Sequence, residues 1–187
     1  MQKEKTTRVL STEDAALFYR LWLPLLDYVN QKYNVNPELG ELSETDSIDP
    51  EEVIVIAKYV WSNPEVIDQY LAHAGLPEEH NEIVAGWKKC RKGTYFLERN
   101  LKKGSIFISA DDLEVYSVLG LFSAWDEMFD YRPIPVMLDA VLLPFRDKII
   151  TDGLVVPYHI VFGRGASADF RDTYMNAKKI GKIHFSL

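Results

Sequence analysis

The run closest to a known ligand-binding motif is Gly163-Arg164-Gly165-Ala166-Ser167-Ala168. It fits the pattern G-x-G-x-x-(G/A), in which glycines let the backbone approach a pyrophosphate at a helix N-terminus. Only 19 residues follow this run, which leaves no room for the second strand and ribose-binding acid of a dinucleotide fold. We therefore favour a simple strand-to-helix turn. A generic anion site formed by Arg164, the backbone of Gly165 and Ser167 stays as a hypothesis.

A basic segment is the second candidate site. Between residues 88 and 103 there are seven basic side chains and one acidic side chain, with Tyr95 and Phe96 among them. Basic residues with interleaved aromatics can hold a single-stranded nucleic acid by neutralising phosphates and stacking on bases. The competing interpretation is a solvated face, or pairing with the acidic stretch 38–52. The candidate nucleic-acid residues are Lys88, Lys89, Arg91, Lys92, Lys102 and Lys103.

Residues 122–135 are rich in aromatic and acidic side chains and form the third candidate. Tryptophan and tyrosine are enriched where proteins contact partners, so this segment could be a partner-binding patch. The alternative is that its aromatics close the open end of a β unit, because aromatic side chains mostly serve cores. The candidate partner-binding residues are Trp125, Glu127, Phe129 and Tyr131.

No catalytic or metal-binding signature is present in the sequence. The four histidines lack the spacing of metal ligands, and Cys90 has no further soft ligands beside it. The G-x-S-x-G turn of serine hydrolases is missing as well. We assign no catalytic residue, no metal and no cofactor, and we leave open whether the chain is an enzyme.

The composition limits the class of protein. The chain has 187 residues and a formal net charge of −7, with 47% hydrophobic and 12% aromatic residues. Such a chain is not disordered, and it can bury roughly 70% of its unfolded surface without disulfides or metals. A single cysteine excludes a disulfide framework and is consistent with a reducing cytosol. Its longest uncharged runs, 115–125 and 153–163, are well short of the about 20 residues that span a bilayer. We expect a cytoplasmic protein without a membrane partner.

The first half of the sequence predicts four helices. Apolar residues recur every four positions from Leu17 to Val29, which predicts a helix over about 12–33 that Pro24 would kink or split. The run Asp49-Pro50-Glu51-Glu52 combines an N-cap, a proline at the first position and acids at the positive helix end. It predicts a helix to about residue 62. Two similar starts predict a helix from about residue 64 that ends at Gly75, and another from about residue 77 to 93.

The second half has the two-residue period of β-strands. Segments 94–100 and 105–110 flank a turn with a glycine, which predicts a hairpin. Strands are also predicted over 114–121, 135–145, 148–151 and 154–162, with a hairpin signal at Asp152-Gly153. A helix over 166–179 and a short strand over 184–187 complete the chain. The expected fold class is α+β, with N-terminal helices packed on a small antiparallel sheet or partly open barrel that carries a C-terminal helix. The expected domains are 1–93 and 94–187, or one compact unit.

The C-terminal half resembles a known family. The run Ala140-Val141-Leu142-Leu143-Pro144-Phe145 is followed by Lys148-Ile149-Ile150 and Asp152-Gly153. This pattern is similar to an uncharacterised family of bacterial proteins with a helical N-terminal part and a small β part. Some members carry a Cys/His metal-binding tail that this sequence lacks, so no metal role carries over. The resemblance implies the architecture, and it implies no activity.

Three classes of function remain open from the sequence. The first is a non-enzymatic binding or adaptor module with a protein partner, using the aromatic segment or the basic segment. The second is a nucleic-acid-associated protein that uses residues 88–103. The third is a small-ligand or anion-binding enzyme with a cleft between the two halves, near Arg164 and His159. We favour the first.

Overall fold

The computed structural model describes residues 8–42 and 49–187. Two compact units make up the chain, one formed by Thr12–Cys90 and the other by Arg91–Leu187 together with the N-terminal stretch through Ser11. The boundary lies just before the expected one at residue 93, because the chain enters its first strand at Arg91. The fold class is α+β, as the sequence predicts.

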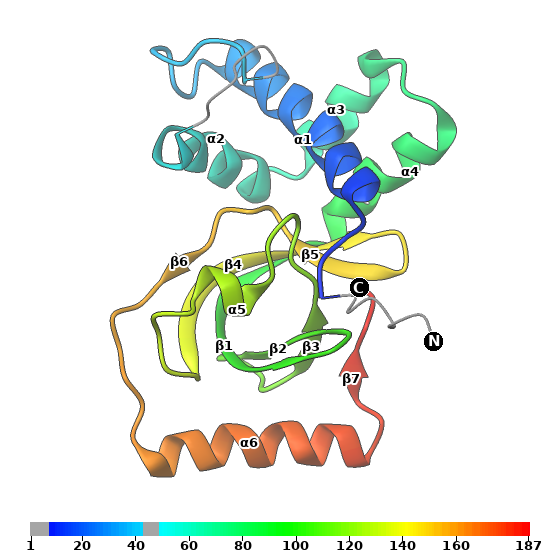
Figure 1. Ribbon diagram of the computed structural model, residues 1–187. Coiled ribbons are helices and arrows are strands. Elements are labelled where there is room, and N and C mark those ends of the chain that lie inside the picture. The colour runs from blue at the N-terminus through cyan, green and yellow to red at the C-terminus, as the bar shows by residue number, and fades with distance from the viewer. Residues whose placement is uncertain (1–7, 43–48) are drawn as a thin grey trace. The chain divides into compact units, whose positions relative to one another are not determined.

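The first unit is helical and has a tryptophan core. Trp22 is buried and stacks on Trp61 with 4.8 Å between ring centroids, and Trp87 meets Trp22 edge to face at 5.8 Å. Such ring pairs add stabilisation beyond the apolar area that they bury. The helices are α1 (Thr12–Tyr33), α2 (Pro50–Ser62), α3 (Glu65–Ala74) and α4 (Glu78–Gly86), followed by a 3₁₀ turn, η2 (Trp87–Lys89) (Figure 1).

The helix ends follow the signals in the sequence. The carboxylate of Asp49 accepts a hydrogen bond from the backbone N–H of Glu51 at 2.9 Å and so caps α2. Gly75 ends α3 in the left-handed conformation with φ of 60°. Two expectations change. Helix α1 runs through Pro24 as one helix, and α4 ends at Gly86, before the expected residue 93, because Trp87 turns into the core.

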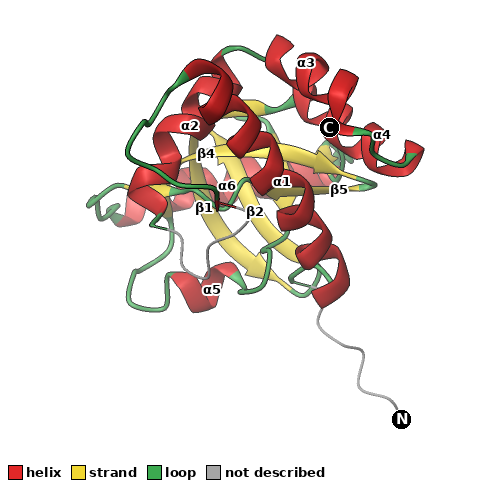
Figure 2. Cartoon of the chain, turned by 90° about the horizontal axis from the view of Figure 1, so that it is seen from above, coloured by secondary structure: helices red, strands yellow, loops and turns green. Residues whose placement is uncertain are grey.

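The second unit is a five-stranded barrel. Its strands follow the order β1-β2-β3-β5-β4, and β1 also pairs with β4, which closes the ring (Figures 1 and 2). Strand β1 pairs with β4 through its first part and with β2 through its second part. The strands are β1 (Arg91–Leu101), β2 (Gly104–Ser109), β3 (Val115–Val118), β4 (Val136–Phe145), β5 (Lys148–Thr151), β6 (Val156–Pro157) and β7 (Ile183–His184).

The sheet is mixed, although the sequence predicts an antiparallel one. Strand β3 pairs in parallel with β5 and with β7, and the other pairs are antiparallel. The predicted hairpin at Asp152-Gly153 is wrong, because β5 and β6 both pair with β4 rather than with each other. Of the predicted strand 154–162, only Val156–Pro157 pairs, and the chain from Tyr158 to Gly163 then runs to the last helix.

The barrel interior is closed at one end by the short helix α5 (Trp125–Met128). Trp125 packs edge to face on Phe107, with 5.1 Å between ring centroids, and both residues belong to the buried core of the barrel. Tyr95, Tyr116 and Leu138 fill the same interior. Residues that point inward alternate with residues that point outward along each strand.

The last helix, α6 (Arg164–Lys179), covers the outer face of β1 and β2. Ile106, Ile108 and Tyr174 are buried there. A register shift in β1 between Leu97 and Arg99 places Arg99 on this face, with its guanidinium 4.2 Å from the ring centroid of Tyr174. None of the helices in the described ranges is long and apolar enough to span a bilayer.

Candidate functional site

The barrel unit carries a groove of about 330 Å³ between two segments that are distant in sequence. One segment follows α5 and the other follows β6. The groove is lined by Tyr131, Arg132, Pro133, Val136, His159, Ile160 and Val161. Its size lies at the lower end of the range for small-ligand sites, which runs from about 300 to 1,000 Å³.

Arg132 joins the two segments of the groove. Its Nη1 donates a hydrogen bond to the backbone carbonyl of Tyr158 at 2.7 Å, and its Nη2 lies 3.5 Å from Nε2 of His159. The backbone N–H of Tyr158 donates to the carbonyl of Met137 at 2.8 Å, which fixes the second segment against β4. The guanidinium also lies 5.3 Å from the ring centroid of Tyr131. The position of the charge is therefore well defined.

Large apolar side chains are exposed along both segments of the groove. Tyr131 is 69% exposed and Val161 is 76% exposed. Exposed apolar side chains are ordinary when scattered singly, whereas a concentration of them marks a contact surface. We call the following set the groove surface: Tyr131, Ile160 and Val161, which line the groove, and Ile134, Val156 and Tyr158, which are exposed close to them in sequence.

The structure separates the four predicted partner-binding residues. Trp125 and Phe129 are 2% and 6% exposed, and their rings stack inside the barrel. The carboxylate of Glu127 accepts a hydrogen bond from the backbone N–H of Ala124 at 3.0 Å and caps α5. Trp125 and Phe129 therefore close the barrel, as the alternative interpretation of this segment expects, and Glu127 is an exposed helix cap. Tyr131 alone lies at the groove.

The predicted anion residues lie in the first turn of α6. Ser167 uses its hydroxyl to donate to the carbonyl of Gly163 at 3.1 Å, which stabilises the helix start. A Cβ atom built at Gly165 would meet nothing within 4 Å. Arg164 is exposed beside it. The three residues therefore lie together at the start of α6.

The basic candidates do not form one strip. Lys88 and Lys89 belong to the helical unit, whereas the other four belong to the barrel unit. Arg91 and Lys92 begin β1, and Lys102 and Lys103 follow its last residue. An eleven-residue strand separates these pairs by roughly 30 Å at 3.3 Å per residue. A single-stranded nucleic acid would not find them on one continuous track.

Three of the basic side chains in this segment have acidic partners in the structure. Lys88 pairs with Asp68 at 2.5 Å and Arg91 with Asp112 at 3.0 Å, while Arg99 pairs with its neighbour Glu98. None of these partners lies in the acidic stretch 38–52. Of that stretch, Glu44 and Asp46 lie outside the described residues.

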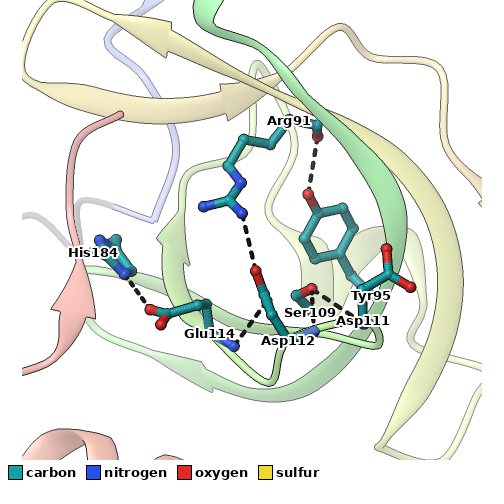
Figure 3. A network of polar contacts seen from close by, with 7 residues as sticks. All are labelled: Arg91, Tyr95, Ser109, Asp111, Asp112, Glu114 and His184. Carbon is teal, nitrogen blue, oxygen red and sulfur yellow. Dashed lines mark hydrogen bonds and ion pairs between the residues drawn. The ribbon is translucent and has the colours of Figure 1, made fainter.

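A network of polar contacts surrounds Arg91 and the turn between β2 and β3 (Figure 3). Besides its ion pair with Asp112, Arg91 accepts a hydrogen bond at its backbone carbonyl from the hydroxyl of Tyr95, at 2.9 Å. Asp112 also accepts from the backbone N–H of Glu114 at 3.1 Å. Glu114 in turn contacts Nε2 of His184 at 2.5 Å and so links β7 to this turn.

The network holds strands and the β2–β3 turn together. Burial raises the pKa of the Tyr95 and Tyr116 hydroxyls above their ordinary value, so both stay protonated at neutral pH and do not act as bases. A hydrogen bond from Ser109 lowers the pKa of Asp112, with the backbone N–H of Glu114 and the charge of Arg91 acting in the same direction. Asp112 is thus held as a carboxylate that fixes the turn.

The helical unit has a shallow hollow, lined by Tyr28, Gln31, Lys32 and His73. The ammonium of Lys32 donates to the hydroxyl of Tyr28 at 2.9 Å and to Oε1 of Gln69 at 2.7 Å. The hydrogen bond with Tyr28 raises the pKa of Lys32. Its charge is already engaged, so this hollow is the weaker candidate. Across the described ranges, no group of three or more His, Cys, Asp or Glu side chains could hold a metal ion.

The key groove residues Arg132, Ile160 and Val161 are absent from the predicted site residues. The uncharged run 153–163 is as typical of a buried strand as of an exposed connection. The exposure of Ile160 and Val161 therefore could not be predicted from the sequence. An arginine next to Tyr131 and Pro133 was the one available signal for the groove.

The strand order of the barrel, with a parallel β3–β5 pair and a helix between β3 and β4, is that of the OB-fold. Proteins with this fold bind oligonucleotides and oligosaccharides on the face of β2 and β3 and on two flanking loops. Fold alone does not define function. Comparisons with protein-family models, curated proteins and solved structures found no match to the chain.

Proposed function

We propose that the chain is a non-enzymatic binding module whose barrel unit contacts a protein partner through the groove surface. The observation that carries this proposal is the exposure of six large apolar side chains on two segments tied together by Arg132. Holding apolar side chains in water gives the monomer no stability, and a partner that covers them gains hydrophobic free energy. Tyrosine and arginine are also the residue types that most often dominate interface energetics.

The test is site-specific photocrosslinking in cells of the native host. A photoreactive benzoylphenylalanine at position 161 is expected to give an adduct of defined mass. The matched control replaces Phe185, which is 62% exposed in the same unit but does not line the groove. The substitution Tyr131→Lys is expected to abolish the adduct at position 161. Equal crosslinking from positions 161 and 185, or none from either, would contradict the proposal.

A second candidate function is binding of single-stranded nucleic acid. The specific observation in its favour is the charge of two loops that OB-folds use for ligands. Lys102 and Lys103 lie in the β1–β2 turn, and Arg146 and Lys148 flank the β4–β5 turn. Against it stands α6, which covers part of the sheet face that such ligands would use. We rank this function second.

A further inference from the structure

Arg132 lines the groove, and its guanidinium nitrogens differ in their partners. Nη1 is used by the carbonyl of Tyr158, as described above. Nε is buried and has no hydrogen-bond partner among the residues that the structure describes. A buried N–H without an acceptor costs free energy, so each such group in a folded protein requires an explanation. Because Nε is enclosed by the protein and Nη1 is used by Tyr158, Nη2 is the nitrogen through which this guanidinium can donate to a ligand in the groove.

The charge of Arg132 is also unbalanced. Within residues 8–42 and 49–187, no Asp or Glu oxygen lies within ion-pair distance of this guanidinium. The nearby group is the imidazole of His159, whose Nε2 lies in front of Nη2 at 3.5 Å. An imidazole at this distance is a poor substitute for an anion, because charge-assisted bonds are shorter and about twice as strong.

The rest of the groove is apolar. Val136, Ile160 and Val161 form its walls with Pro133, and the ring of Tyr131 lies beside the guanidinium. A bare inorganic anion would leave these walls in contact with water. A ligand with an apolar body next to its charged group uses both features, because the walls gain about 25 cal/mol for each Å² of apolar surface that they bury.

We propose that the groove binds a carboxylate carried on an apolar body, held by Nη2 of Arg132 in place of the imidazole of His159. The inference rests on the proposed function and deepens it by naming the group that the groove receives. The carboxylate is that of a peptide C-terminus of the partner, because the same groove carries the apolar side chains that the proposed function assigns to a protein contact. Preference for a free organic acid is the alternative outcome that the probes distinguish. Binding displaces the imidazole of His159 from its position in front of Nη2.

The experiment titrates the full chain with four probes while amide resonances are followed by NMR. Octanoate and N-acetyl-leucyl-leucine carry a carboxylate, whereas octanol and the dipeptide amide carry the same apolar bodies without charge. We expect both carboxylates to shift the amide resonances of residues 131, 132, 134, 136 and 158–161 and to bind at least tenfold more tightly than their neutral counterparts. Tighter binding of the dipeptide identifies a peptide C-terminus, and tighter binding of octanoate identifies a free acid. Equal affinity for charged and neutral probes would overturn the proposal.

Three variants locate the site. Arg132→Gln is expected to lower octanoate affinity at least tenfold, and His159→Ala to raise it severalfold. Because Arg132→Gln also removes the link to Tyr158, Val161→Asp serves as the variant that leaves the fold intact, since Val161 is largely exposed. Its negative charge is expected to weaken octanoate binding severalfold. Arg171→Gln, at an exposed arginine of α6 outside the groove, is the matched control and should change nothing.

The results separate the two proposals. Crosslinking from position 161 without any preference for carboxylate probes leaves the binding module standing and removes the carboxylate site. A carboxylate preference that depends on Arg132, without a crosslinked partner, removes the protein partner and leaves a site for free organic acids. Unchanged octanoate affinity in both Arg132→Gln and Val161→Asp places the binding elsewhere and overturns this inference.

Discussion

The ring of Phe170 in α6 stacks on the ring of Phe96 in β1, with 4.2 Å between centroids and 29° between planes. Phe162 meets both rings edge to face. Together with the contact of Arg99 and Tyr174, this cluster fixes the C-terminal helix on the barrel. The chain therefore covers with its own aromatic side chains a face that OB-folds commonly leave free for ligands.

Phe170→Ala is expected to loosen α6 and to lower the free energy of unfolding by about 2 kcal/mol, less than a fully buried phenylalanine would cost. Urea denaturation gives the free energy, and hydrogen exchange shows whether the amides of α6 lose protection first. Met175→Ala, at an exposed position of the same helix, is the control. Equal effects of the two substitutions would show that the stack does not hold the helix.

Trp125→Ala is expected to destabilise the chain by about 3–5 kcal/mol, because it removes the aromatic plug of the barrel core. Tyr131→Ala should change stability by no more than about 0.5 kcal/mol, since its side chain is mostly exposed. Thermal or urea unfolding of both variants tests the difference. A small effect of Trp125→Ala would mean that α5 does not close the barrel in solution.

Asp112 makes stability depend on pH in the acid range. In the folded chain the pKa of Asp112 lies below its ordinary value of about 3.9. Its carboxylate therefore stabilises the fold in full when the pH is above about 3.9. The contribution is lost as the pH falls through the lowered pKa. Asp112→Asn should therefore differ most from the wild type above pH 5, and the difference should shrink below pH 4. Urea unfolding over this range tests it, with the exposed residue Asp172, changed to Asn, as the control. A difference that does not vary with pH would count against the ion-paired turn.

Binding to single-stranded DNA can be decided by its salt dependence. If the loop lysines contact phosphates, Lys102→Gln with Lys103→Gln should reduce the slope of log K against log salt by about 1.4, or about 0.7 for each lost contact. Fluorescence anisotropy with labelled dT20 measures the slope. The control changes Lys178 and Lys179, both exposed on α6, to glutamine. Undetectable binding, or an unchanged slope, would remove nucleic acid as the second candidate function.

Local signals in the sequence predict much of the secondary structure. The N-cap, proline and glutamate at residues 49–52 predict the start of α2, and Gly75 marks the end of α3. The hairpin of β1 and β2 follows from two alternating segments and a turn with Gly104, whose φ is 134°. These features depend on a few neighbouring residues, so they can be recognised without knowledge of the fold.

The placement of side chains in the candidate site could not be predicted in the same way. Trp125 and Tyr131 are both aromatic residues in one short acidic segment, yet one closes the barrel and the other is exposed. Ile160 and Val161 have the composition of a core strand, but the chain must pass from β6 to α6 and leaves them in water. Which of these side chains are buried depends on how distant strands pair. The periodicity of apolar residues along the sequence does not specify that pairing.

Residue types and short-range spacing are enough to predict the α+β class, the four N-terminal helices and most of the strands. They are also enough to show that the sequence has no G-x-S-x-G turn and no histidines at the spacing of metal ligands. The fold is needed to show that β1 closes on β4, that α6 covers the outer face of β1 and β2, and that Arg132 meets the segment after β6. These features arise in the fold because burial and hydrogen-bond satisfaction depend on which distant segments become neighbours. The unsatisfied Nε of Arg132 exists as a feature only once that neighbourhood has formed.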